Sequence, residues 1–477
     1  MFAFLSASCS GDSDSEGGDI SNSSALSSGS GGGLEGSSSS ASISIEKLGL
    51  TPGSTTESLN LAWYSNTGSE NEGSYARLFD SEGNAISTAS DGIYAAAVAG
   101  KLFHKITING LAAGTAYKYA VSNNGRDWSD KYDYKVPAAG AFRFAAVSDP
   151  QITLGNQDPT GNYISTPPTV AQGWKDAVAK IAATGASLII GAGDQIDQGA
   201  GDFEEKYALF FAPTELRNIP YAPSVGNHDT HCNFLYHYNL PNERVPGTTC
   251  TSGAGIYGLN GKGFYYYIYN NVLFVMLNTS APVANVDGAR QLVSIYEEII
   301  VNAKTANSGR YDWIVVFQHK PTQSVADHSA DKDVQYYVEA GFERLMTAQG
   351  VDLVVSGHDH IFAKSKLLKQ GSGDLFSRPS TDGTGTIYLT ITSVSGSKFY
   401  APFICSNNPN YPYLANGATG CSNMNANNLP IGVDAYLQNA IPQYTIVDVD
   451  GANMTLKTYG LNGVLYDEFS LSPTLQK

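Results

Sequence analysis

The sequence predicts two folded units in series, a small all-β sandwich followed by a larger α/β unit. Short runs of alternating apolar and polar residues extend from residue 43 to residue 137, and from residue 141 apolar strand-like runs alternate with amphipathic stretches. A chain of 477 residues is long enough for two or three domains with substantial cores. We therefore expect an N-terminal segment at 1–42, a β unit at 43–137 and an α/β unit at 141–477.

The composition excludes two classes of protein. Asp and Glu number 44 against 28 Lys and Arg, so the formal net charge is -16 and no basic field is available to hold a nucleic-acid backbone. We therefore expect no nucleic-acid polymer as a partner. No apolar run approaches the roughly 20 residues that a helix needs to cross a bilayer, so we expect no integral membrane protein.

The first 42 residues have the character of an export signal and a tether. Met1–Leu5 is a short apolar stretch that runs through small residues into Cys9, which resembles a bacterial lipoprotein processing site. Ser, Gly and acidic residues then dominate as far as Ser42, a composition that does not fold and behaves as a flexible linker. We expect lipidation of Cys9 and an exported protein, either at the bacterial cell envelope or surface or secreted, with the lipid as its sole membrane contact. An unstructured N-terminus with an incidental cysteine is the alternative.

The remaining four cysteines fall into two close pairs, Cys232 with Cys250 and Cys405 with Cys421. Three connectivities are possible. We expect disulfides in the sequential order, because each pair lies within a loop-like stretch rich in Asn, Pro, Gly and Thr, where a bridge restricts the chain most. Four buried free thiols are the alternative. The spacings do not match a zinc knuckle, so no cysteine is assigned to a metal.

The β unit contains runs with a period of two, separated by Gly and Asn turns, at 59–64, 103–108 and 117–121. This pattern is typical of an antiparallel β-sandwich. The stretch 108–119 resembles the turn and following strand of a fibronectin type III domain. We interpret His104, within the second run, as a structural residue.

The α/β unit contains buried strand-like runs separated by helical patterns. The expected strands lie at 142–147, 188–190, 272–277, 313–317 and 351–355, and the expected helices at 169–184, 287–305 and 333–349.

Side chains that can bind a metal follow these strands directly. They are Asp149, Gln151, Asp194, Asp197, Asn227, His228, His319, His358 and His360. Because the carboxyl ends of the strands form the ligand-binding edge of an α/β sheet, five loops deliver these donors to one place. Carboxylate, amide and imidazole donors without thiolate suit zinc, iron or manganese, and there are more of them than one ion uses. Two ions about 3.5–4 Å apart, bridged by one carboxylate, would use them and clamp a phosphoryl displacement.

The order of these motifs is similar to that of the calcineurin-like metallophosphoesterase superfamily. The motifs are Asp149, Gly193-Asp194, Gly226-Asn227-His228-Asp229, His319 and Gly357-His358-Asp359-His360. With a β unit in front, the chain resembles the purple acid phosphatases and their bacterial relatives. The resemblance implies two β-sheets flanked by helices, with the last strands, at 444–449 and 456–459, packed onto them.

The resemblance also implies the ligand sets and the chemistry. Asp149, Asp194 and His360 would hold one metal ion. Asp194, Asn227, His319 and His358 would hold the other, with Asp194 as the bridge. The reaction would be attack of a metal-bound hydroxide on phosphorus. His228 is the candidate general acid or phosphate-oxygen donor, and His328 lies where relatives place substrate-facing histidines.

Two positions depart from the pattern of the family. Gln151 stands where a histidine is usual, and its amide oxygen would be a weaker ligand or a hydrogen-bonding neighbour. Asp197 stands where purple acid phosphatases have the tyrosine that binds ferric iron and gives the colour. We retain both residues as candidate ligands and expect no purple colour. The identity of the two ions, among iron, zinc and manganese, stays open.

We therefore expect an exported dinuclear metal-dependent phosphoesterase that hydrolyses small phosphate monoesters. A phosphodiesterase or nucleotidase with the same metal core is one alternative. A non-catalytic surface binding module is the other, and the complete ligand set argues against it.

Overall fold

The computed structural model of the protein describes residues 44–473, apart from 69–71, 155, 158–162, 165–168, 200–201, 248–249, 251–258, 260, 282, 372–373, 375, 407–419 and 424–428. The chain divides into two compact units, residues 1–42 and 43–477. Cys9 and the expected tether lie outside the described residues. Among the helices of the described part, none is long and apolar enough to span a bilayer.

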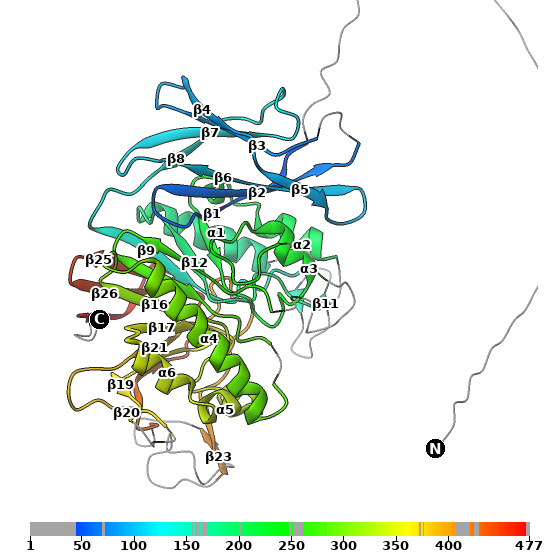
Figure 1. Ribbon diagram of the computed structural model, residues 1–477. Coiled ribbons are helices and arrows are strands. Elements are labelled where there is room, and N and C mark those ends of the chain that lie inside the picture. The colour runs from blue at the N-terminus through cyan, green and yellow to red at the C-terminus, as the bar shows by residue number, and fades with distance from the viewer. Residues whose placement is uncertain are drawn as a thin grey trace, which may run out of the picture. The chain divides into compact units, whose positions relative to one another are not determined.

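The first eight strands form two antiparallel sheets of four strands each (Figure 1). One sheet has the order β1-β2-β6-β5, with strands Glu46–Pro52, Ser58–Asn66, Lys101–Asn109 and Ile93–Ala96. The other has the order β4-β3-β7-β8, with strands Ala85–Ala89, Tyr75–Phe79, Ala116–Ser122 and Tyr132–Lys135. Leu61, Trp63 and Tyr119 are buried in their shared core. The expected small all-β sandwich is confirmed.

His104 is part of the packing of this sandwich. Its ring stacks on Trp63 with 5.0 Å between the ring centroids. Its Nε2 lies 2.8 Å from Ser65 Oγ and its Nδ1 lies 3.0 Å from Ser74 Oγ. Burial lowers the pKa of His104 to about 4, so the ring is neutral at pH 7.

The α/β unit contains one sheet of six strands in the order β13-β12-β9-β25-β26-β27. The strands are Tyr221–Pro223, Ile189–Gly191, Phe142–Val147, Gln443–Asp450, Asn453–Gly460 and Leu465–Leu471. The first three are parallel, and β25 adds to β9 in the antiparallel sense. The last strands of the chain therefore pack onto the sheets of the α/β unit, as the sequence predicts, and they do so by joining the six-stranded sheet.

A second sheet contains seven strands in the order β14-β15-β16-β17-β21-β18-β24. The strands are Tyr265–Tyr269, Val272–Met276, Trp313–Phe317, Leu353–Ser356, Ile387–Thr390, Phe362–Ser365 and Val433–Leu437. Strands β15, β16, β17 and β21 are parallel. Phe144 of β9 packs edge-on against Phe274 of β15, with 5.2 Å between ring centroids, so the two sheets share one core.

Helices cover the outer faces of both sheets. α1 (Thr169–Ala183) packs Trp174 and Val178 with residues of β9 and β12. α4 (Val286–Ala306) and α6 (Phe342–Gln349) pack against β15 and β16 (Figure 1). The other helices are α2 (Phe203–Phe210), α3 (Cys232–His237), α5 (Lys332–Glu339) and the 3-10 turns η1 (Thr214–Arg217) and η3 (Asp327–Ala330). The expected sandwich of two sheets flanked by helices is confirmed.

The prediction of a single helix over 333–349 is wrong, because the segment is divided. The structure has two short helices there, α5 and α6, interrupted at Gly341. Gly341 has φ of +92°, a left-handed conformation that an L-residue adopts only with strain and that breaks the helical hydrogen-bond ladder. The apolar periodicity continues across the break, and for that reason the pattern indicates one helix.

Short strand pairs complete the architecture. They are β10 (Asn156–Gln157) with β11 (Tyr163–Ile164), β19 (Leu368–Lys369) with β20 (Arg378–Pro379), and β22 (Phe403–Ser406) with β23 (Gly420–Asn423).

Glu204, in the first turn of α2, joins the sandwich to the α/β unit. Its carboxylate lies 2.9 Å from Lys47 Nζ and accepts a hydrogen bond of 3.1 Å from Tyr64 Oη, both in the sandwich. On the α/β side it accepts a bond of 2.6 Å from Asn233 Nδ2 and lies 3.1 Å from His237 Nε2. These donors hold the pKa of Glu204 below its usual range although burial opposes this.

We predict that His104 makes the fold sensitive to acid. Its folded-state pKa of about 4 lies below the ordinary value of 6.5, so the stability that the neutral buried ring contributes is complete above pH 6.5 and is lost as the pH falls toward 4. Between pH 7.5 and pH 4.5 we expect the wild type to lose about 2–3 kcal/mol more stability than His104→Gln, whose amide does not titrate. Urea unfolding of both chains at the two pH values measures this difference. Equal losses in both chains would contradict it.

Candidate metal centre

The candidate ligands lie at the carboxyl ends of five parallel strands, from both sheets. Asp149 follows β9, Asp194 follows β12 and Asn227 follows β13 in the six-stranded sheet. His319 follows β16 in the seven-stranded sheet, and His358 and His360 follow β17. Three of these residues, Asp149, Asp194 and His319, have ligand atoms that all lie within 4.8 Å of one another. Candidate ligands from both sheets therefore meet at one edge of the two-sheet sandwich.

The backbone at this edge is strained. Positive φ angles occur at Asp149 (51°), Gln151 (38°), Asp194 (55°), His358 (68°) and His360 (46°). Residues other than glycine rarely adopt this region, and each such residue costs of order 1–3 kcal/mol. Strain of this kind persists where the surrounding structure enforces it, and it clusters at functional sites. Five strained residues at one sheet edge therefore support a functional site there.

Glycines allow the ligand loops to pack closely. A Cβ atom on Gly226 would lie 2.0 Å from Asp194 Oδ1, and a Cβ atom on Gly357 would lie 2.5 Å from Asp149 Oδ2. The glycine that precedes Asn227 and the one that precedes His358 are thus required by the approach of the two carboxylates.

Asp194, Asn227 and His319 form the first group of donors. Nδ1 of His319 donates to the carbonyl of Ala192 at 2.9 Å, so in the neutral ring Nε2 carries a lone pair. This Nε2 lies 2.9 Å from Asn227 Oδ1 and 3.3 Å from Asp194 Oδ2. Three acceptor atoms that face one another in a buried place repel unless a proton on Nε2 or a metal cation lies among them. Burial alone would lower the pKa of His319, but the Asp194 carboxylate outweighs it and raises the pKa to about 9, which shows how strongly the site favours positive charge.

Asp149, His360 and His358 form the second group. His360 Nδ1 donates to the carbonyl of Lys398 at 3.2 Å, and its Nε2 lies 3.4 Å from Asp149 Oδ1. The backbone N–H of His358 donates to Asp149 Oδ2 at 3.0 Å. Nε2 of His358 is buried and has no hydrogen-bond partner among the described residues. Burial lowers the pKa of both imidazoles, of His360 to about 3, so both rings present lone pairs at neutral pH.

The two groups fit a dinuclear metal centre. The donors are oxygen and nitrogen atoms without thiolate, the chemistry that borderline ions such as zinc, iron and manganese accept. The unpartnered Nε2 of His358 and the opposed lone pairs around His319 are polar atoms that a bound cation would satisfy. Asp194 and Asp149, each buried, supply negative charge to both groups.

Asp229 connects two of the ligand loops without facing the donors. Its Oδ2 accepts hydrogen bonds from the N–H groups of Asp194 at 2.7 Å and Gly226 at 2.8 Å, and its Oδ1 accepts one from Gln195 at 3.1 Å. This buried carboxylate therefore fixes the strained turn at Asp194 relative to Asn227.

Gln151 and Asp197 contact residues of the centre through their side chains. Nε2 of Gln151 donates to Asp194 Oδ2 at 2.9 Å, and its Oε1 has no partner among the described residues. Asp197 Oδ1 lies 3.0 Å from His228 Nδ1, and its Oδ2 accepts from the N–H of Gly199 at 2.9 Å. Gln151 thus orients the carboxylate of Asp194, and its own amide oxygen has no partner among the described residues, whereas Asp197 contacts His228.

His228 lies between two carboxylates. Its Nδ1 contacts Asp197, its Nε2 lies 3.9 Å from Asp194 Oδ2, and its backbone N–H donates to Asp194 Oδ1 at 2.9 Å. Burial opposes the charged ring, but Asp194 and Asp197 together raise the pKa of His228. The N–H of Gln198 also donates to His228 Nδ1 at 2.9 Å, so Nε2 is the ring nitrogen that can exchange a proton with a group at the centre.

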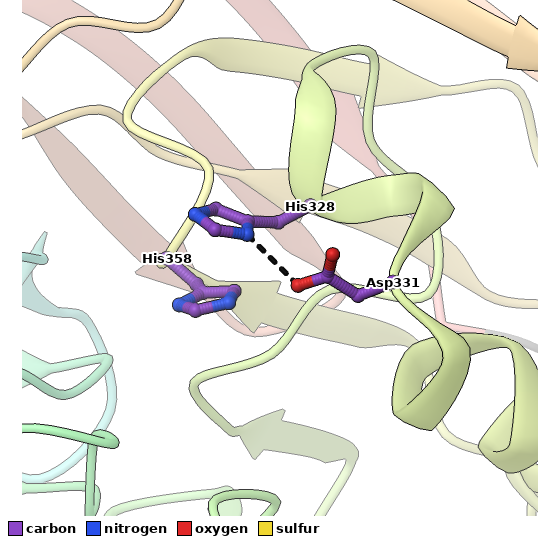
Figure 2. A group of neighbouring side chains, drawn as sticks. All are labelled: His328, Asp331 and His358. Atoms are coloured by element: carbon purple, nitrogen blue, oxygen red, sulfur yellow. Dashed lines mark hydrogen bonds and ion pairs between the residues drawn. The ribbon is translucent and has the colours of Figure 1, made fainter.

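His328 comes from η3 and lies against His358 (Figure 2). The two rings stack with 4.2 Å between centroids, and His328 Nδ1 lies 2.8 Å from Asp331 Oδ2. The backbone N–H of His328 donates to Asp359 at 3.0 Å. His328 thus contacts a candidate ligand, and its role toward the substrate stays a prediction. His328, Asp331 and His358 also form a separate cluster of side chains that could hold a cation.

His231 and His237 lie away from the donors. The ring of His231 stacks on Phe203 at 4.2 Å, and His237 binds Glu204.

The sequence analysis missed a loop that follows β21. Ser393 Oγ and Ser397 Oγ both donate to the carbonyl of Asp149, at 2.9 and 3.0 Å. Tyr400 packs edge-on against His328 and His360, at centroid distances of 5.3 and 4.9 Å. The signal was present, because the apolar run 387–391 ends in a Ser-Gly-Ser turn like the other strand ends. It passed unnoticed because the loop has no metal-ligating residue.

The structure contains the Cys232–Cys250 disulfide, as the sequential pairing predicts. In the antiparallel pair of β22 and β23, Cys405 lies opposite Cys421 in register. Their side chains lie outside the described residues, so this second disulfide stays a prediction. In antiparallel pairs opposite Cα atoms are about 4.5–5.5 Å apart, a separation that a disulfide accepts.

Two family models match the chain. Residues 142–362 match the calcineurin-like phosphoesterase family, and residues 45–136 match the N-terminal domain of purple acid phosphatase. None of the curated proteins matches the chain in sequence.

Among solved structures, the purple acid phosphatase PPD1 from yellow lupin (Lupinus luteus) seeds has a TM-score of 0.62 at 14% identity, over 91% of this chain and 75% of that one. This likeness shows a shared fold. A dimetal phosphatase from Danio rerio aligns at 12% identity and a TM-score of 0.40, over 70% of this chain and 100% of that one. A putative 5'-nucleotidase from Staphylococcus aureus aligns at 12% identity and a TM-score of 0.30, over 71% and 55%.

We predict that Asp194→Asn loses the metal. The substitution removes the charge that faces both groups of donors, so we expect metal affinity to fall at least about 100-fold. Metal content after dialysis, measured by mass spectrometry, checks this. Asp176→Asn, which removes an exposed carboxylate of α1, is the matched control and should keep the wild-type content. Full metal content in Asp194→Asn would show that Asp194 is not a ligand.

Proposed function

Since this chain belongs to the purple acid phosphatase-like, calcineurin-like metallophosphoesterases and is therefore a metal-dependent phosphoester hydrolase, we propose that it hydrolyses phosphate monoesters. One observation carries the proposal: Asp194 Oδ2 and Asn227 Oδ1 both face His319 Nε2. A second group of donors around Asp149 lies beside them. Such donors suit a pair of cations, and a dianionic monoester is the ester that two cations and two histidines hold best.

The residues divide into two ligand sets. Asp149, Asp194 and His360 would hold one ion, and Asp194, Asn227, His319 and His358 would hold the other. When bound, the two ions supply an activated water as the nucleophile and neutralise charge on the phosphate oxygens. Gln151 holds the bridging carboxylate through its hydrogen bond of 2.9 Å.

His228 acts as the general acid. A leaving alkoxide needs a proton in the transition state, and the contact with Asp197 at 3.0 Å holds the imidazole in place beside the centre. The Asp194 and Asp197 carboxylates favour the protonated ring. His328, which stacks on His358 and lies 2.8 Å from Asp331 Oδ2, donates to a phosphate oxygen of the substrate.

In this proposal the metals are iron, zinc or manganese. No tyrosine binds iron, so the coloured iron–tyrosinate pair is not formed. The carboxylate of Asp197 takes the position of the tyrosine in purple acid phosphatases and is bound to His228 and the N–H of Gly199. A visible absorption band from tyrosinate is therefore not expected.

Export of the protein is part of the proposal. The Cys232–Cys250 disulfide supports an oxidising compartment, because disulfides persist outside the cytosol. The Ser- and Gly-rich composition before residue 43 supports a tether, and Cys9 supports a lipid anchor at the cell surface.

The proposal is tested by hydrolysis of 4-nitrophenyl phosphate and of methyl 4-nitrophenyl phosphate. The protein is reconstituted separately with zinc, iron and manganese, and kcat/KM is measured for each ester. We expect the monoester to be preferred with at least one of these metals. A preference for the diester would make the protein a phosphodiesterase, and no turnover of either ester by metal-loaded protein would favour a binding module.

We predict that His228→Ala slows esters with poor leaving groups selectively. Loss of a general acid costs about 10²–10⁴ in rate when the leaving group needs the proton. We therefore expect an alkyl phosphate to lose at least about 100-fold in kcat, and 4-nitrophenyl phosphate, whose leaving group is stable as an anion, to lose much less. His231→Ala, in the same loop but stacked on Phe203, is the control and should leave both rates near wild type. Equal losses on both esters, with metal content unchanged, would refute the role of His228 as general acid.

A further inference from the structure

The loop after β21 is bound to the metal centre at three points. Ser393 and Ser397 donate to the carbonyl of Asp149, and the N–H groups of Gly396 and Ser397 donate back to Ser393 Oγ at 3.1 and 2.9 Å. The carbonyl of Lys398 accepts the Nδ1–H of His360 at 3.2 Å. The backbone of Lys398 is thus fixed relative to a ligand from each of the two sheets.

The loop after β21 borders a cavity beside the centre. The cavity has a volume of about 160 Å³ and is lined by Lys398 together with Gln151, Asp197 and Thr169. Gln151 is the residue that bonds to Asp194, and Asp197 is the residue that contacts His228. The cavity therefore adjoins both the bridging carboxylate and the general acid.

Lys398 differs from the other lysines near this edge. Lys320 pairs with Asp333, and Lys206 donates to the carbonyls of Asp197 and Gly199 at 2.8 and 2.7 Å. Lys398 is half-buried, and no ion pair or side-chain hydrogen bond engages it among the described residues. A half-buried ammonium group without a carboxylate is available to an anion that enters the site.

We propose that Lys398 is a specificity-determining residue that binds a phosphate oxygen of the substrate and favours monoester dianions over diester monoanions. This inference rests on the proposed function of the same site. A monoester carries about one more negative charge than a diester above its second pKa, which is about 6, and this charge lies on an oxygen that a diester blocks with carbon. An ammonium group that meets this oxygen stabilises the monoester dianion more than the diester monoanion.

The test compares wild type with Lys398→Met, which keeps the length of the side chain and removes the charge, and with Lys398→Arg, which keeps the charge. At pH 8 we measure kcat/KM for 4-nitrophenyl phosphate and methyl 4-nitrophenyl phosphate, which share one leaving group. We expect Lys398→Met to lose roughly tenfold to hundredfold on the monoester, the value of one charge-assisted hydrogen bond, and to change little on the diester. Lys398→Arg should recover much of the loss. Lys118→Met, which removes a lysine of the sandwich, is the matched control.

A binding measurement separates this inference from the proposed function. Calorimetric titration of metal-loaded protein with inorganic phosphate and with dimethyl phosphate reports the preference for a dianion without turnover. We expect the wild type to prefer phosphate and Lys398→Met to lose most of that preference. An unchanged preference in Lys398→Met, or equal losses on both esters, would overturn the role of Lys398. A wild type that binds phosphate through Lys398 but hydrolyses neither ester would overturn the proposed function instead.

Discussion

The structure depends on one electrostatic constraint, the burial of several lone pairs that face one another. Asn227 Oδ1 and Asp194 Oδ2 lie 2.9 and 3.3 Å from His319 Nε2, and the Nδ1 proton of His319 is donated to a backbone carbonyl. Such an arrangement is unfavourable without positive charge, as the raised pKa of His319 shows. Two cations would satisfy these atoms and the unpartnered Nε2 of His358 together.

The rest of the fold holds these atoms together although their arrangement is electrostatically unfavourable. Strained turns hold the ligands. The positions just before Asn227 and His358 have no room for a Cβ atom, so glycine occupies them. Asp229 accepts three backbone N–H groups and so fixes two of the ligand loops, while Ser393 and Ser397 fix Asp149 from the opposite sheet. Hydrophobic packing of two sheets on one core positions the strand ends, and these hydrogen bonds set the final geometry.

The sequence was sufficient to predict the architecture and most of the donors, because these depend on local signals. Apolar strand runs ending in Asp, Asn or His indicate the ligand-binding edge, and the structure places Asp149 and His319 there. Contacts made by tertiary packing were not predictable. Nothing in the local sequence shows that Asp197 meets His228 or that Lys398 lines the adjoining cavity.

A crystal structure of the metal-loaded protein, with anomalous scattering measured at the absorption edge of the added metal, tests the central claim most directly. The account predicts two anomalous peaks about 3.5–4 Å apart, with an Asp194 oxygen between them, Asp149 and His360 on one side and Asn227 and His319 on the other. One peak alone, or a peak at His328 and Asp331 with none beside Asp194, would contradict it.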